Sequence, residues 1–377
     1  MTIPVSVTKA RKFAEDVTTS KGTVDNAACF QAALDGGKSI FQQMWEYHKI
    51  SRGPGKLDFN DYMMYQLWND EKYSFEEKRQ FVSDSFYFQI VKQCCDPSWW
   101  ILADDKFWSY TVLGANGFPV PETQGVFCNG DRVFGGVPTL KNGTELREFF
   151  EQATYPIYSK PVHGIGSFGN FLIEGFEDGH VIFHDGSKMF VHEFVYEIDG
   201  VNGQLMQTML KPHPQLAPIS SRVSTIRVIV IIQDGQAKVL STVWKIPSND
   251  NIADNFWRDG NMLASVDIEG GHVNRIVGYE NRVPKVLEED SEAYKQLMGM
   301  QLPDWDEAVD ICRRGAFHFP KLKFQSWDIG LSDSGPVVVE FNPGSSFRLS
   351  QLAEGRGFLT DEFLGFLRGC GCKLKAR

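Results

Sequence analysis

The spacing of apolar residues divides the chain into a helical first part and a mixed remainder. Across 23–47, apolar positions recur every three or four residues on either side of a Gly-Gly step, which predicts two helices. A capping-box pattern begins at Ser74, and apolar residues continue at helical spacing as far as Ile90. The pattern therefore predicts a helical N-terminal region over 1–98 whose apolar residues serve packing.

From Trp99 onward, short β-branched and aromatic runs alternate with turn signals. We expect strands at 124–127, 157–161, 171–176, 180–184, 205–210, 225–232, 237–245, 325–331 and 337–341. We expect helices at 106–116, 144–153, 187–198 and 304–315. Because hairpins and helices are mixed rather than strictly alternating, the fold class is α+β. The regions 99–210 and 211–377 are predicted to form two lobes.

The charge balance limits the classes of partner. The chain carries 48 acidic and 38 basic side chains, a formal net charge of -10. This argues against a protein that coats nucleic-acid phosphates and against a polybasic membrane binder. The longest apolar run, 228–232, is far shorter than the roughly 20 residues that a membrane helix needs. With no secretory-signal pattern at the start, we expect a cytoplasmic protein without a membrane span.

The cysteines indicate a reduced compartment. There are seven of them, an odd number at irregular spacing, which does not suit a disulfide framework. Cys370 and Cys372 have the spacing of a redox or metal pair, but the sequence places no second pair or histidine beside them. Ordinary free thiols are therefore the expectation.

A glycine-rich segment is the most conspicuous local motif. Gly164, Gly166 and Gly169 formally match a dinucleotide-binding fingerprint, but the segment leads into the strand expected at 171–176 rather than into a helix. A glycine loop between antiparallel strands, entered through Lys160, instead favours a lid whose backbone N–H groups cover nucleotide phosphates. A hairpin tip that only turns sharply is the alternative.

The hairpin expected near the C-terminus carries possible metal ligands. Because side chains alternate along a strand, Glu340 and Asn342 project to one face, and the hairpin can bring Asp328 to the same face. Two carboxylates and an amide oxygen suit Mg²⁺ that also binds substrate phosphates. An ordinary polar face of a hairpin is the alternative.

Arg227 interrupts the apolar strand expected at 225–232. A buried guanidinium without an anionic partner is strongly unfavourable, so we expect Arg227 to face an anion or a cleft. A phosphate suits its forked donor geometry.

Taken in order, these elements resemble the ATP-grasp fold, specifically the sugar-transfer-associated ATP-grasp group. The resemblance runs from about Asp61 to the C-terminus, and its specificity comes from the order of the motifs. The motifs are Asp104–Lys106 with 117–123, Tyr155–Pro161 with the glycine loop, 203–210, 211–214, 223–227, 253–256 and the hairpin. The resemblance implies two α+β lobes that clasp ATP, with a helical N-terminal extension.

The resemblance also implies roles for individual residues. Lys106 and Lys160 contact the nucleotide phosphates, and the lid of Gly164, Gly166, Ser167 and Gly169 encloses them. The segment 203–210 stands where the family has the hinge between its two lobes, and it binds adenine through Gln207, Met209 and Leu210. Asp328, Glu340 and Asn342 hold Mg²⁺, while Arg227 and Lys160 act in catalysis. Two positions depart from the family pattern, since Gln207 stands where an acid is usual and Lys245 where arginine is more usual.

The function implied is an ATP- and Mg²⁺-dependent ligase that joins a carboxylate to an amine through an acylphosphate. The family label points to secondary-metabolite or surface-saccharide biosynthesis, with a uronic acid or amino acid as a substrate. From the residues themselves, the loops with Asn255, Arg258, Ser345, Ser346 and Arg348 suit a carboxylate, or are ordinary surface loops. An ATP-dependent small-molecule kinase and a non-catalytic nucleotide-binding protein are the alternatives. The oligomeric state stays open, a homodimer included.

Overall fold

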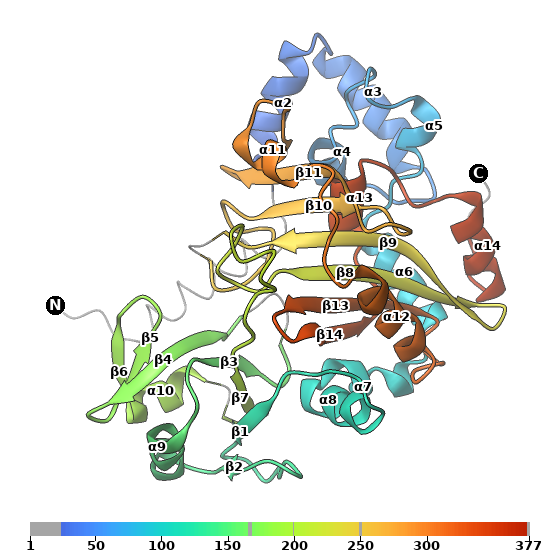
Figure 1. Ribbon diagram of the computed structural model, residues 1–377. Helices are drawn as coiled ribbons and strands as arrows, with labels where there is room; N and C mark the ends of the chain where they lie inside the picture. Colours follow the sequence, from blue (N-terminus) through green and yellow to red (C-terminus); the bar gives the residue numbers. More distant parts are fainter. Residues whose placement is uncertain (1–23, 165–167, 199, 249–250, 375–377) are drawn as a thin grey trace. The chain divides into compact units, whose positions relative to one another are not determined.

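The computed structural model describes residues 24–164, 168–198, 200–248 and 251–374. The chain forms two compact units, shown in sequence colours in Figure 1. Unit 1 comprises Met1–Trp100, Ser224–Asp328 and Asn342–Arg377, and unit 2 comprises Ile101–Val223 and Ile329–Phe341. Each unit therefore combines segments that lie far apart in the sequence. The division into 1–98, 99–210 and 211–377 stays a prediction.

The N-terminal region of unit 1 is helical, as predicted. It contains α2 (Asn26–Asp35), α3 (Ile40–Ser51), α4 (Phe59–Met64), α5 (Phe75–Lys78), α6 (Asp84–Cys94) and the 3₁₀ turn η1 (Pro97–Trp99). Capping boxes begin α3, α4 and α5, where the N-cap side chain and the side chain three residues later satisfy each other's free N–H groups.

The helix expected from Ser74 to Ile90 is not continuous, which corrects the sequence-based expectation. The capping box at Ser74 starts only the four-residue α5, and Ser83 caps a separate helix, α6. Between them, the backbone N–H of Val82 donates to Gln351 Oε1 at 2.8 Å, and Gln351 Nε2 donates to the Val82 carbonyl at 2.9 Å. These two side-chain bonds replace the helical bonds of Val82, so the helix breaks there.

A largely antiparallel sheet organises unit 1. Its strands are β8 (Thr225–Gln233), β9 (Gln236–Ile246), β10 (Met262–Val266), β11 (Val273–Glu280), β12 (Val283–Val286) and the first half of β13 (Phe324–Ser332). The helices are α11 (Glu292–Leu297), α12 (Trp305–Ala316), α13 (Arg348–Glu354) and α14 (Asp361–Gly369). The pattern predicted β8, β9, β13 and α12, but missed β10, β11 and β12.

Unit 2 contains a second sheet in the order β2-β1-β7-β3-β4-β5-β6. The strands are β1 (Thr123–Phe127), β2 (Thr139–Leu140), β3 (Ile157–Pro161), β4 (Phe171–Glu177), β5 (His180–Phe183), β6 (Lys188–Phe190) and β7 (Gln204–Thr208). The helices are α7 (Ile101–Asp104), α8 (Lys106–Ala115), α9 (Gly143–Gln152) and α10 (Val191–Glu197). Strand β14 (Gly335–Pro343) starts in this unit and ends in unit 1.

Two details of unit 2 bear on the predictions. Strands β3 and β4 are antiparallel, so the glycine segment joins two antiparallel strands as expected. The helix expected over 187–198 begins too early, because Lys188–Phe190 pairs with β5 as strand β6 and the helix starts only at Val191. Although the segment has helical spacing, its pairing with β5, in which Phe190 lies opposite His180, makes it a strand.

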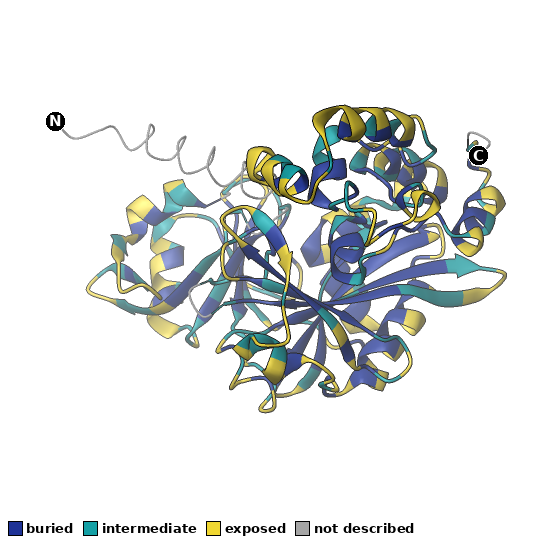
Figure 2. Cartoon of the chain, turned by 90° about the horizontal axis from the view of Figure 1, so that it is seen from above, coloured by how far each residue is buried: buried dark blue, intermediate teal, exposed yellow. Residues whose placement is uncertain are grey.

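Each unit has its own apolar core. In unit 1, Tyr62 and Met63 of α4 pack in one cluster with Leu263 of β10 and Ala353 of α13. This cluster joins the N-terminal helices to the sheet. In unit 2, Phe150 of α9 belongs to a cluster with residues of α10, β3, β4 and β7. Figure 2 shows that the strands are mostly buried, while the outer faces of α2 and α3 are exposed. Every helix in the described part of the chain is too short or too polar to reach across a bilayer.

Candidate functional site

Lys106 is the first residue of α8 in unit 2. The helix starts there because the Asp105 side chain accepts the backbone N–H of Trp108 at 3.0 Å, which satisfies a free N-terminal donor. The buried Lys106 side chain donates from Nζ to the Gly164 carbonyl at 2.8 Å. Its Nζ also lies 3.3 Å from Glu340 Oε1. Lys106 therefore contacts both the start of the glycine segment and a predicted metal ligand.

Lys160 projects from β3 toward the same helix. Its Nζ donates to the hydroxyl of Tyr110 at 2.7 Å, and that hydroxyl donates to the Val339 carbonyl at 2.5 Å. Only 5% of Lys160 is exposed. Burial, followed by repulsion from Lys106, lowers the pKa of Lys160 to about 7, against an opposing effect of Glu340. Among the described residues, no carboxylate forms an ion pair with Lys160.

Sequence reasoning missed Tyr110. The residue follows Lys106 by four positions on α8, so the two side chains share one face of the helix. That spacing is the signal from which its place beside the predicted phosphate lysines could have been inferred.

The glycine segment is described in part. Gly166 and Ser167 lie outside the described residues. Gly169 has a φ of 69°, in the left-handed region that glycine tolerates, and its carbonyl accepts Gln204 Nε2 at 2.9 Å. The predicted lid is thus anchored at Gly164 by Lys106 and at Gly169 by Gln204.

The predicted adenine-binding residues lie at the end of β7. The buried Gln207 donates from Nε2 to Thr123 Oγ1 at 3.1 Å. Met209 and Leu210 follow the last strand residue and are half-buried. The Met209 backbone N–H donates to the Pro156 carbonyl at 3.1 Å. The Gln207 amide group therefore contacts the neighbouring strand β1.

Asp328 lies in unit 1 with two cations around it. Arg227 of β8 donates from Nε to Oδ1 and from Nη2 to Oδ2, both at 2.8 Å, and Lys245 of β9 donates to Oδ2 at 3.0 Å. Burial alone would raise the pKa of this carboxyl, but the charges of Arg227 and Lys245 outweigh it and hold the pKa well below its usual range. The anion that faces Arg227 is therefore the Asp328 carboxylate.

The predicted metal ligands are divided between the units. Asp328 and Asn342 belong to unit 1 and Glu340 to unit 2. Both oxygens of Asp328 accept hydrogen bonds from cations, and the Glu340 side chain, 26% exposed, pairs with Lys106. In the described ranges, His, Cys, Asp and Glu residues form no group of three or more that could hold a metal ion. The oxygen donors are of the type that Mg²⁺ prefers, and the site stays a prediction.

The loop after β14 is held by acidic residues of the N-terminal region. Ser346 Oγ donates to Asp84 Oδ1 at 2.6 Å, and Arg348 Nε lies 3.2 Å from Asp84 Oδ2. Arg348 Nη2 lies 3.7 Å from Oδ1 of the fully buried Asp61, whose pKa is raised to about 7 by burial and then by the nearby Asp58. The structure thus brings Ser346 and Arg348 together, with the buried Ser345 beside them.

The other predicted substrate loop is organised by Asn261. This fully buried amide donates to the Asn255 carbonyl at 2.7 Å and accepts the Ser248 backbone N–H at 2.7 Å. The Arg258 backbone N–H donates to the same Asn255 carbonyl at 3.2 Å. Asn255 and Arg258 are therefore neighbours on a half-buried loop of unit 1 that the hydrogen bonds of Asn261 hold in place.

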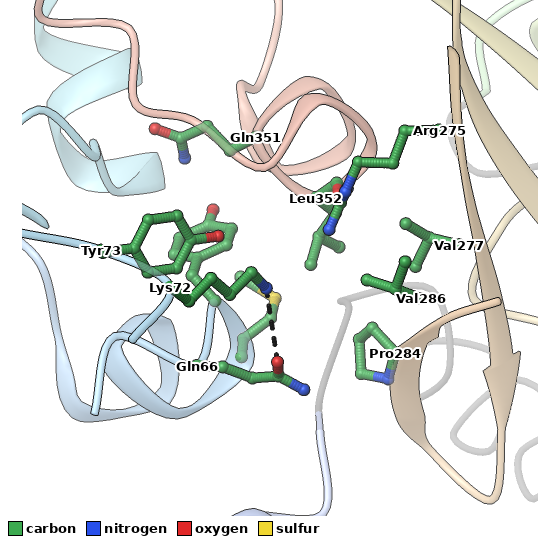
Figure 3. A pocket seen from close by; sticks show the side chains of 11 residues that line it. Gln66, Lys72, Tyr73, Arg275, Val277, Pro284, Val286, Gln351 and Leu352 are labelled. Atoms are coloured by element: carbon green, nitrogen blue, oxygen red, sulfur yellow. Dashed lines mark hydrogen bonds between the residues drawn. The ribbon is translucent and has the colours of Figure 1, made fainter. Parts of the chain in front are cut away.

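Unit 1 also contains a pocket that the sequence did not predict (Figure 3). Its lining residues are Met64, Tyr65, Gln66, Lys72, Tyr73, Arg275, Val277, Pro284, Val286, Gln351 and Leu352. Arg275 donates to the Ala353 carbonyl at 2.5 Å and so caps α13. Burial, followed by the charge of Arg275, lowers the pKa of Lys72 to about 8. The predicted site residues are not among those that line this pocket.

The family model of the sugar-transfer associated ATP-grasp proteins matches residues 86–363, well over half of the chain. The chain belongs to this ATP-grasp family. The ATP-grasp fold was the fold predicted from the order of the motifs, and that prediction is confirmed. No protein among the curated sequences matches the chain.

Solved structures similar to this ATP-grasp chain include ligases. The VanG D-Ala:D-Ser ligase from Enterococcus faecalis is 15% identical, with a TM-score of 0.40 over 74% of this chain and 64% of that one. D-alanyl-alanine synthetase A from Vibrio cholerae O1 biovar eltor str. N16961 is 14% identical, with a TM-score of 0.42 over 73% and 67% of the two chains. An L-amino acid ligase from Bacillus licheniformis is 13% identical, with a TM-score of 0.34 over 71% and 44%. The chain thus spans about two thirds or less of the length of these relatives.

Proposed function

We propose that this ATP-grasp chain is an ADP-forming ligase that joins a carboxylate to an amine through an acylphosphate. The observation that carries the proposal is the pair of Lys106 and Lys160 in unit 2. Lys160 is a buried amine whose pKa is lowered to about 7, and a second ammonium group lies near enough to contribute to that shift. Two buried cations beside a glycine segment suit a polyanionic ligand such as a nucleotide triphosphate.

The two lysines have complementary parts in the proposal. Lys106, fixed by the Gly164 carbonyl and Glu340, supplies a positioned positive charge. Lys160, fixed by the Tyr110 hydroxyl, takes up a proton when phosphate oxygens approach, because an adjacent negative charge favours its charged form. The lid that we propose runs from Gly164 to Gly169 and includes Gly166 and Ser167. Its backbone N–H groups would exclude water and contact the phosphates.

The hinge and the catalytic arginine complete the proposed machinery. Gln207, Met209 and Leu210 are proposed to border the adenine. Arg227 is proposed to stabilise the transferring phosphoryl group, and Asp328 fixes the plane of its guanidinium through two hydrogen bonds. Mg²⁺, when bound by Asp328, Glu340 and Asn342, would neutralise phosphate charge. The proposed catalysis is positioning and electrostatic stabilisation.

Carboxylate recognition is proposed for the loop with Ser345, Ser346 and Arg348, and for Asn255 and Arg258. Asp84 contacts both Ser346 and Arg348 and so holds the loop donors in one place. Replacing Arg348 by Ala should raise the KM for the carboxylate far more than the KM for ATP. Equal changes in both constants would show that Arg348 does not select the carboxylate. A uronic acid or amino acid, in a biosynthetic context, is the proposed substrate class.

The proposal is tested by ADP release in a screen of acids and amines, including uronic acids and amino acids. Stimulation by a carboxylate and amine pair, with the amide found by mass spectrometry, supports it. Lys160→Met should lower ADP release by orders of magnitude, while Lys188→Met, which removes an exposed lysine that pairs with Glu177 in the same unit, should leave it unchanged. Equal activity of the two variants would contradict the assignment of Lys160.

A non-catalytic nucleotide-binding protein is the second candidate, favoured by the amide of Gln207 at a position where the family usually has an acid. It predicts tight nucleotide binding without ADP release for every acid tried. Hydroxylamine traps an acylphosphate as a hydroxamate, so hydroxamate formation excludes this candidate. Transfer of phosphate to a hydroxyl in the same screen would instead identify a kinase.

A further inference from the structure

Cys94 meets the C-terminal cysteines, far away in the sequence, within unit 1. Cys94 is the last residue of α6, and Cys370 and Cys372 follow α14. The Sγ atoms of Cys94 and Cys372 lie 3.7 Å apart although 278 positions separate them in the chain. Nothing in the sequence indicated that the C-terminal pair has a partner. In the described part of the chain, all seven cysteines are free.

Hydrogen bonds fix the main chain at both cysteines. The Cys372 N–H donates to the Leu367 carbonyl at 2.9 Å, and the Cys94 carbonyl accepts the Lys323 N–H at 3.0 Å. The neighbouring Cys95 is engaged elsewhere, because its thiol donates to the Phe324 carbonyl at 3.1 Å. The main chain is therefore held at Cys94 and Cys372, and Cys95 is not part of the pair.

The surroundings give the pair a nucleophile and a proton donor. Hydrogen bonding with Cys370 and Cys372, assisted by burial, raises the pKa of Cys94. The same contacts from Cys94 lower the pKa of Cys370 and of Cys372. The Cys372 sulfur is thus the better thiolate and Cys94 the thiol that supports it. Two thiol sulfur atoms 3.7 Å apart are close enough for oxidation to a disulfide after a small movement.

We propose that Cys94 and Cys372 form a redox-active dithiol, a modification site at which a hydroperoxide converts the two thiols to a disulfide. The Cys372 thiolate attacks one peroxide oxygen, the O–O bond breaks, and a sulfenic acid and hydroxide result. The Cys94 sulfur then attacks the sulfenic sulfur, so that the S–S bond forms and the S–O bond breaks. The departing oxygen takes the Cys94 proton and leaves as water. Two electrons pass from the sulfur atoms to the peroxide.

The geometry requires a small movement only. A disulfide bond is about 2.0 Å long, so the two sulfur atoms must approach by less than 2 Å from their present separation. Side-chain rotation at Cys372, which lies in the turn after α14, can supply this approach. The bond would tie the end of α6 to the C-terminal segment.

The test treats the folded chain with hydrogen peroxide, blocks the remaining thiols and digests the chain with trypsin without reduction. The expected product links peptide 93–106 to peptide 369–373, and fragmentation places the bond between Cys94 and Cys372. Cys128 and Cys312 are internal controls, because each is buried with a carbonyl partner, and they should remain free thiols. Dithiothreitol should reverse the link. Absence of the link from the folded wild-type chain overturns the proposal.

Single substitutions identify the sulfur atoms. Cys372→Ser and Cys94→Ala should reduce the yield of the link at least tenfold, whereas Cys95→Ser and Cys370→Ser should form it at the wild-type rate. Circular dichroism checks that each variant is folded. If Cys94→Ala does not fold, the peptide map of the oxidised wild-type chain still shows whether Cys94 and Cys372 are linked. Loss of the link in Cys370→Ser together with its retention in Cys372→Ser would assign the chemistry to Cys370 and overturn the pairing proposed here.

Discussion

Arg227 holds both carboxylate oxygens of Asp328, with Nε to Oδ1 and Nη2 to Oδ2 at 2.8 Å each. The pair lies on two strands of unit 1, and the side chain of Asp328 is only 6% exposed. Lys245 adds a second cation at 3.0 Å from Oδ2. A carboxylate in this position has a structural part in addition to any part in metal binding, because it balances the charge of Arg227 and shares Lys245 with Asp254, which lies 3.4 Å from Lys245 Nζ.

The first prediction follows from this pair. Asp328→Asn keeps the shape but removes the anion that Arg227 and Lys245 share, and Lys245 keeps only Asp254 as a carboxylate partner. Unfolding should therefore cost about 3 to 5 kcal/mol less than in the wild-type chain. Urea denaturation followed by circular dichroism measures the change. Asp310→Asn is the matched control, since Asp310 pairs with Arg314 on the exposed face of α12 and should change stability by less than about 1 kcal/mol. Equal effects of the two variants would contradict the structural part assigned to Asp328.

The second prediction concerns the pH dependence that Lys160 confers. Its pKa is about 7 in the folded chain and has the usual value of 10.5 when unfolded, so the unfolded state binds more protons between these values. The free energy of unfolding should therefore rise with pH, by about 2 to 3 kcal/mol between pH 7 and pH 9. Lys160→Met should lack this rise. The control Lys188→Met should retain it, because Lys188 is exposed. Parallel stability curves for wild type and Lys160→Met would show that Lys160 keeps its proton when folded.

The fold was predictable where local pattern and final pairing agree. Strand β8 has an unbroken β-branched run and was found within a residue of its bounds. Strand β10 reads Met-Leu-Ala-Ser-Val, with small residues that have little strand preference, and β12 contains Pro284, so both were missed. The segment Lys188–Phe190 has helical spacing in the sequence, and only its pairing with β5 makes it a strand.

Candidate site residues could be named from the sequence where they belong to a local motif. Lys160 was named from the glycine-rich segment that follows it, and Lys106 from the family resemblance. The structure puts Lys106 Nζ 3.3 Å from Glu340 Oε1, and Glu340 opposes the lowering of the pKa of Lys160. The cations around Asp328 were not foreseen, because the contact depends on how β8, β9 and β13 are aligned in the sheet. The contacts of Arg348 with Asp61 and Asp84 join segments more than 260 residues apart, which no local pattern reveals.

The third prediction is that a substitution at Glu340 affects activity far more than stability. Glu340→Gln removes the negative charge of a proposed Mg²⁺ ligand while keeping the shape, so the proposed ADP-forming activity should fall by orders of magnitude. Its side chain is 26% exposed and pairs with Lys106 at 3.3 Å, so stability should change by about 1 kcal/mol or less. ADP release across a Mg²⁺ series and a thermal melt measure the two effects. Glu177→Gln, at the exposed pair with Lys188, is the control for loss of a carboxylate in the same unit. Unchanged activity at every Mg²⁺ concentration would remove Glu340 from the active site.

The last prediction concerns Asp61, the buried partner of Arg348. Its pKa is about 7 in the folded chain against 3.8 when unfolded, because burial and Asp58 disfavour the charged form more than Arg348 favours it. The folded state then binds more protons between these values, so stability falls as the pH rises from about 4 to about 7. Asp61→Asn removes this ionisation. The variant should therefore gain about 3 kcal/mol relative to wild type between pH 4 and pH 7, and the gain should level off by about pH 8.

Urea denaturation at pH 4, 5.5, 7 and 8.5 measures this difference, and Asp310→Asn, at an exposed pair, supplies the baseline. A constant difference between Asp61→Asn and wild type across the series would mean that folding does not raise the pKa of Asp61, so that its carboxyl is ionised in the folded chain at pH 5.5 and above. Arg348 would then be balanced by two charged carboxylates, Asp61 and Asp84, rather than by Asp84 alone below pH 7. The pH series therefore determines how much of the Arg348 charge is left for a substrate carboxylate.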